Sequence, residues 1–61
     1  MKVKIKTYNG EIHRNFHVNK EYECHERNSD TFFAIDEDGY PWICKFNNCP
    51  ILGGGSWEIV E

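Results

Sequence analysis

Hydrophobic and polar residues alternate along most of this 61-residue chain. In residues 2–7, Val3 and Ile5 point to one side and three lysines to the other, which predicts a strand with one buried face. Residues 21–26 repeat the pattern, because Tyr22 and Cys24 alternate with charged side chains. No segment carries a helical repeat of useful length, so the pattern predicts an all-β protein.

Two turn signals organise these strands. Asn9-Gly10 predicts a hairpin that joins the first strand to residues 11–18, in which Phe16 and Val18 share a face. The first strand then has one free side, and its lysines are the kind of residue that protects an exposed sheet edge. Pairing of this edge with a second copy makes either a monomer or a homodimer compatible with the sequence.

The second turn signal, Asp38-Gly39, is the strongest in the chain. It joins residues 31–35, which are apolar on both faces and are expected to form the most central strand, to residues 40–46. The latter place Trp42, Cys44 and Phe46 on one face.

The end of the chain completes the pattern. Residues 47–55 contain Pro50 and three consecutive glycines, so they allow one helical turn at most. Residues 56–61 form a last strand that turns Trp57 into the core. Five or six short antiparallel strands with tight turns predict one small β-barrel domain over residues 1–61.

The order of these signals resembles that of a known group of proteins. Phe16-x-Val18-x-Lys20-x-Tyr22 leads into a strand, an acidic turn ends at Gly39, and the chain closes on Trp57-Glu58-Ile59-Val60. This resembles the small SH3-like β-barrel proteins encoded by bacteriophages and prophages. The resemblance implies an SH3-like barrel, a viral origin and a binding role, and it carries no catalytic residue across.

Charge limits the choice of partner. The net charge is −3, and the basic residues gather in residues 1–20 while acids dominate residues 21–61. A dominant basic field, which nucleic-acid binding normally requires, is missing. A nucleic-acid-binding barrel is therefore the less favoured alternative, and it would use the following stacking and phosphate-binding side chains: Tyr8, Tyr40, Trp42, Lys2, Lys4, Lys6 and Arg14.

The sequence also indicates a location. It shows no apolar stretch suited to a signal peptide or a membrane helix. Three cysteines do not make a closed disulfide framework, which favours a reducing compartment. We therefore expect a cytoplasmic protein, in the host cytoplasm if it is viral, with no membrane partner.

Cysteine and histidine are frequent enough to raise structural zinc as a second alternative. His13-x3-His17 and Cys44-x4-Cys49 have usable spacings, although the paired Cys-x2-Cys of many zinc sites is absent. Cys24 and Cys44 occupy apolar-face positions, where a thiol behaves as a small hydrophobe. The complete candidate set is His13, His17, Cys24, His25, Cys44 and Cys49, but we predict no metal and no cofactor.

Catalysis is not expected. Cys49 is the best candidate nucleophile, but no acidic or amide side chain is clearly placed to orient a histidine beside it. The carboxylates of Asp36, Glu37 and Asp38 are consecutive in a turn, where such residues bond to the local backbone.

The aromatic and acidic residues of this hairpin are the predicted binding surface. Tyrosine and tryptophan are favoured anchors at protein interfaces. The sequence thus predicts a non-enzymatic module that docks on a host or viral protein and modulates its activity. The predicted binding residues are Tyr40, Trp42, Asp36, Glu37 and Asp38.

Overall fold

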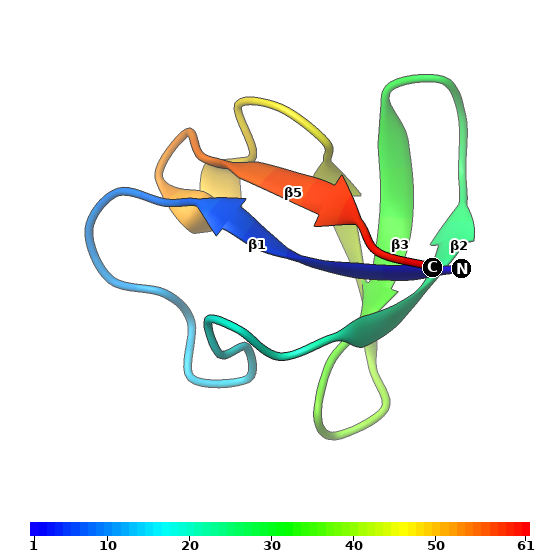
Figure 1. The fold of residues 1–61 in the computed structure, drawn as a ribbon, viewed down its shortest axis with the longest axis horizontal. Helices are drawn as coiled ribbons and strands as arrows, with labels where there is room; N and C mark the ends of the chain where they lie inside the picture. Colours follow the sequence, from blue (N-terminus) through cyan, green and yellow to red (C-terminus); the bar gives the residue numbers. More distant parts are fainter.

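The computed structural model describes all 61 residues as five antiparallel strands and one 3-10 turn (Figure 1). The strands form one sheet in the order β4-β3-β2-β1-β5. The predicted all-β fold of five to six short antiparallel strands, with at most one helical turn, is confirmed. No helix of this protein has the length and apolar character needed to cross a membrane. The elements are β1 (Lys2–Thr7), β2 (Tyr22–Glu26), β3 (Thr31–Ile35), β4 (Pro41–Lys45), η1 (Pro50–Leu52) and β5 (Ser56–Ile59).

The two ends of the sheet meet just beyond β4. The backbone N–H of Trp57 donates to the carbonyl of Phe46 at 3.0 Å, and Cys49 and Gly55 form an isolated bridge next to it. These contacts curl the sheet into a barrel. The termini lie side by side (Figure 1), because the Lys2 N–H donates to the carbonyl of Glu61 at 3.0 Å.

The prediction that β1 is an exposed edge is wrong. β1 pairs with β2 on one side and with β5 on the other. In this register Lys2 lies opposite Glu23 and Lys4 opposite Glu58, and the Lys4 ammonium is 3.7 Å from the Glu58 carboxylate. β1 is therefore an interior strand, which pairs with β2 at Lys2 and Val3 and with β5 over most of its length.

The predicted hairpin at Asn9-Gly10 is also wrong. Residues 8–21 form a long loop without a strand, and β1 pairs with β2 instead. The loop is tied elsewhere, since the Asn9 N–H donates to the carbonyl of Leu52 in η1 at 2.9 Å. Phe16 is buried but Val18 is 39% exposed, so the two side chains do not share a buried strand face.

An aromatic cluster fills the barrel. Phe16 reaches in from the loop, and its ring centroid lies 5.0 Å from that of Tyr22 and 5.5 Å from those of Trp42 and Trp57. The edge-on geometry of these contacts is a favourable arrangement for aromatic rings. Trp57 is 4% exposed, which confirms its predicted place in the core. The loop is therefore fixed to the barrel at Phe16.

β3 lies inside the sheet, but β2 rather than β3 occupies its centre. The prediction of β3 as the most central strand is wrong because β1 and β5 both lie beyond β2. One face of β3 packs in the core through Phe32 and Ala34, while Phe33 and Ile35 on the other face are only half-buried. The two apolar faces of β3 therefore do not indicate burial on both sides, because the outer face is an apolar surface that is partly exposed.

Candidate functional site

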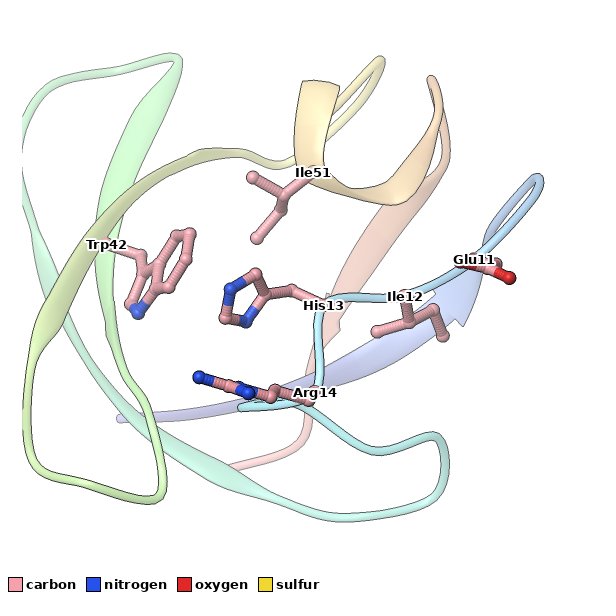
Figure 2. Close-up of a pocket in the computed structure, with 6 residues that line it drawn as sticks. All are labelled: Glu11, Ile12, His13, Arg14, Trp42 and Ile51. Carbon is pink, nitrogen blue, oxygen red and sulfur yellow. The ribbon is translucent and has the colours of Figure 1, made fainter.

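The largest hollow on the protein is an open groove with a volume of about 540 Å³ (Figure 2). This volume is within the range of small-molecule and peptide sites. β4 supplies one wall, residues 11–14 of the long loop supply the other, and η1 closes one end. The lining residues are Glu11, Ile12, His13, Arg14, Trp42 and Ile51.

Trp42 is the largest side chain of the groove and is held on three sides. Its ring lies 4.6 Å from the His13 ring, centroid to centroid, and 5.5 Å from that of Phe16. Its indole N–H donates to Oδ2 of Asp36 at 2.6 Å. Figure 2 shows the indole pointing across the groove towards His13, with Ile51 reaching down from η1. A half-buried tryptophan is thereby fixed in one orientation.

The carboxylate of Asp36 fixes the orientation of the Trp42 indole. Oδ2 accepts hydrogen bonds from Trp42 and from the Asn15 side chain at 2.9 Å, while Oδ1 accepts from the backbone N–H groups of Asp38 and Tyr40, each at 2.9 Å. The carboxylate is 6% exposed and uses all four of its usual acceptor positions. It therefore joins the hairpin turn, the tryptophan and the long loop.

The protonation of Asp36 follows from these contacts. Burial by itself raises the pKa of a carboxyl group, but the hydrogen bonds from Trp42, Tyr40, Asn15 and Asp38 stabilise the anion and lower the pKa of Asp36 from 3.8 to about 2. Asp36 is a carboxylate at neutral pH. It acts as a structural anion and has no free acceptor for a partner.

The other predicted acidic residues differ from one another. The Glu37 carboxylate lies 2.9 Å from Nε2 of His17 and 3.3 Å from the Lys20 ammonium, so it links the turn to the long loop. Asp38 is exposed, and Tyr40 is 66% exposed. Of the five predicted binding residues, Trp42 alone lines the groove.

Sequence reasoning did not assign the opposite wall to a binding site. His13 was considered only as a metal ligand and Arg14 only as a phosphate contact, while Ile12 and Ile51 were not singled out. The available signal was weak: Ile12 is a single apolar residue in a polar segment, and Ile51 lies beside Leu52 in an irregular one. Both isoleucines pack against the edge of the core.

The candidate zinc ligands do not gather. No group of three or more Cys, His, Asp or Glu side chains is placed to hold a metal ion. Cys44 and Cys49 are neighbours in the core, and both are fully buried. The interaction between the two thiols, together with burial, raises the pKa of Cys44. The same interaction lowers the pKa of Cys49, whose sulfur accepts a hydrogen bond from the Trp57 indole N–H at 3.4 Å. This pair is sealed from any substrate in the groove.

Comparisons with known proteins do not place the chain in a family. No family model, no curated protein and no solved structure matches it.

Proposed function

We propose that this protein is a non-enzymatic binding module whose groove takes an extended, partly apolar segment of a partner protein. The observation that carries the proposal is the fixed Trp42 wall. A large aromatic surface that is already oriented loses little conformational freedom when a ligand covers it. Tryptophan is also among the residues that contribute most to protein interfaces.

The chemistry of the groove supports binding over catalysis. Ile12 and Ile51 add apolar surface, and Glu11 and Arg14 offer one charge of each sign. The one histidine of the groove, His13, accepts the backbone N–H of Asn15 on Nδ1 at 3.1 Å. No thiol or hydroxyl lines the groove beside it, so a nucleophile and a base are not paired there.

The nature of the partner follows from the same features. A protein segment suits an apolar groove better than a nucleic acid does, because Lys2 and Lys4 of β1 lie opposite acids rather than in a free basic stripe. The resemblance to phage-encoded barrels supports a bacterial host protein or a viral protein in the host cytoplasm as the partner.

The test compares two histidine substitutions. His13→Glu places a charge in the groove, while His25→Glu makes the same change on an exposed residue of β2 that lies outside it. Each tagged variant is used to capture proteins from nuclease-treated bacterial lysate. The wild type and His25→Glu are expected to capture the same proteins in similar amounts. The amount captured by His13→Glu should be lower by about tenfold or more.

Two results would contradict the proposal. One is equal capture by His13→Glu and His25→Glu, with both variants folded by NMR, since the groove would then not be the site. The other is recovery that depends on nucleic acid and disappears with nuclease, which would favour the alternative of a nucleic-acid-binding barrel.

A further inference from the structure

The free side of β4 carries unpaired backbone groups. In antiparallel strands, residues point their N–H and C=O groups alternately towards one neighbour and the other. The Asp36 N–H donates to the carbonyl of Tyr40 at 2.9 Å, so Tyr40 points its backbone groups towards β3. Every second residue does the same, which means that Trp42 and Cys44 also point their N–H and C=O groups towards β3. Ile43 therefore points its N–H and C=O away from β3, and it makes no backbone hydrogen bond to a loop or to another element.

The barrel covers this edge only at its C-terminal end, where the backbone N–H of Lys45 meets the buried Cys49 sulfur. Its closing bond joins Trp57 to Phe46, which lies past the end of β4. Pro41 has no N–H to offer, so the unpaired stretch centres on Ile43 and includes the carbonyl of Pro41. An edge of this kind is a template for another extended chain.

Apolar surface lies on both faces of β4 next to that edge. On the inner face Trp42 forms the wall of the groove. On the outer face Ile43 is 58% exposed and lies opposite the half-buried Phe33 of β3, and Pro41 lies opposite Ile35. We call these four residues, Phe33, Ile35, Pro41 and Ile43, the outer patch.

We propose that the partner segment binds as an additional antiparallel strand on the free edge of β4, with successive side chains in the groove and on the outer patch. This inference rests on the proposed function and specifies its mode. Successive side chains of a strand point to opposite faces. An antiparallel strand on this edge would therefore place one residue against Ile43 and the next against Trp42, so the segment needs two consecutive apolar residues.

Charge complementarity specifies one more position. Lys45 is exposed on the outer face at the end of β4. In an antiparallel strand, the residue opposite Lys45 comes two positions before the residue opposite Ile43. The recognised segment thus reads acidic, any residue, apolar, apolar from its N-terminus. A second copy of β4 does not fit, since its Pro41 would lie opposite Lys45 and bring neither an acid nor an N–H.

The experiment uses a random dodecapeptide display library selected on the intact protein. One enriched peptide is synthesised, and its affinity is measured for four folded proteins: the wild type, Ile43→Pro, Ile43→Val and His13→Glu. Proline removes the outward N–H at a position where an edge strand tolerates it. Valine is the matched control, because it keeps the N–H and has a similar size.

Strand addition predicts about a tenfold or greater loss of affinity for Ile43→Pro and less than about a threefold loss for Ile43→Val. It also predicts that the peptide slows hydrogen exchange at the Ile43 amide of the wild type, a measurement that does not depend on the folding of the proline variant. The enriched peptides should share the acidic, any, apolar, apolar order.

The opposing outcomes separate the two proposals. Strand addition would be overturned if Ile43→Pro binds the peptide as tightly as the wild type, or if the peptide leaves hydrogen exchange at the Ile43 amide unchanged. If His13→Glu also loses affinity for the peptide, the groove remains the site. Unchanged affinity for His13→Glu, or a library without any binder, would overturn both. If no peptide binds and the wild type is a dimer that Ile43→Pro dissociates, the edge belongs to a second copy of the chain. That result would also overturn the inference.

Discussion

Two connections position the groove, and they do so by different means. The turn of residues 36–40 leads into β4 and is organised by a charged side chain, Asp36, whose hydrogen bonds include the one to Trp42. The connector of residues 49–55 carries Ile51 and is organised by the absence of side chains. A Cβ on Gly55 would lie 2.0 Å from the Thr7 carbonyl oxygen. One connection depends on a charge and the other on close backbone contact.

The largest effect is expected from adding one methyl group to the connector. Gly55→Ala puts a Cβ into the backbone of Thr7 and Tyr8, which cannot move without breaking the pairing of β1 with β5. We expect a loss of about 3 kcal/mol in the free energy of unfolding. That is comparable to the whole stability of a domain of this size, so Gly55→Ala should be largely unfolded by circular dichroism.

Gly54→Ala is the control for that change. Gly54 has a φ of +93° and open space around its Cβ position, so alanine meets backbone strain without a clash. Gly54→Ala should lower the free energy of unfolding by about 1 kcal/mol. Equal stability of the two variants in urea titrations would show that the close approach at Gly55 relaxes easily.

The turn should respond to acid. The pKa of Asp36 is about 2 in the folded protein and 3.8 as its ordinary value, so its ionisation stabilises the fold above about pH 4. This contribution is lost as the pH falls from 4 to 2. Asp36→Asn should be less stable than the wild type at neutral pH, and the difference should shrink over that window in thermal unfolding scans.

Asp38→Asn is the matched control, because Asp38 is an exposed carboxylate on the same turn. It should keep the acid dependence of the wild type. If Asp36→Asn and Asp38→Asn lose stability equally at neutral pH, the carboxylate of Asp36 does not organise the turn.

A small effect, comparable to that of Gly54→Ala, is expected at the glycine of the turn. Gly39 has a φ of +85° and nothing near its Cβ position, in contrast to Gly55. Gly39→Ala should therefore cost about 1 kcal/mol through backbone strain alone. A D-alanine introduced by chemical synthesis accepts this φ and should recover the loss in urea titrations. A larger loss that D-alanine does not recover would mean that the turn, like the connector, needs bare backbone.

The strands were predictable because their signal is local. Alternation of Val3 and Ile5 identified β1, and Asp38-Gly39 located the hairpin of β3 and β4. The hairpin at Asn9-Gly10 was mispredicted because the same dipeptide signal carries no information about a distant partner. Asn9 bonds to η1, more than forty residues away in the chain.

The groove was only half predictable for the same reason. Trp42 follows a recognisable turn, so it could be singled out as an aromatic anchor. Ile12 and Ile51 belong to irregular segments without an alternating pattern, and it is the tertiary structure that brings both to the groove. The sequence predicted that the carboxylates of the acidic turn bond to the local backbone, as Asp36 does, but no sequence signal shows that the indole N–H of Trp42 reaches Asp36.

The pairing of β1 with β5 has a consequence for how fast the barrel forms. Val3 and Ile59 are partners in this ladder, so nearly the whole chain must close into a loop before the ladder exists. Loop closure over such a distance slows folding more than it affects final stability. A circular permutant that links residue 61 to residue 1 and opens the long loop at Gly10 would turn this ladder into a local hairpin and should fold faster.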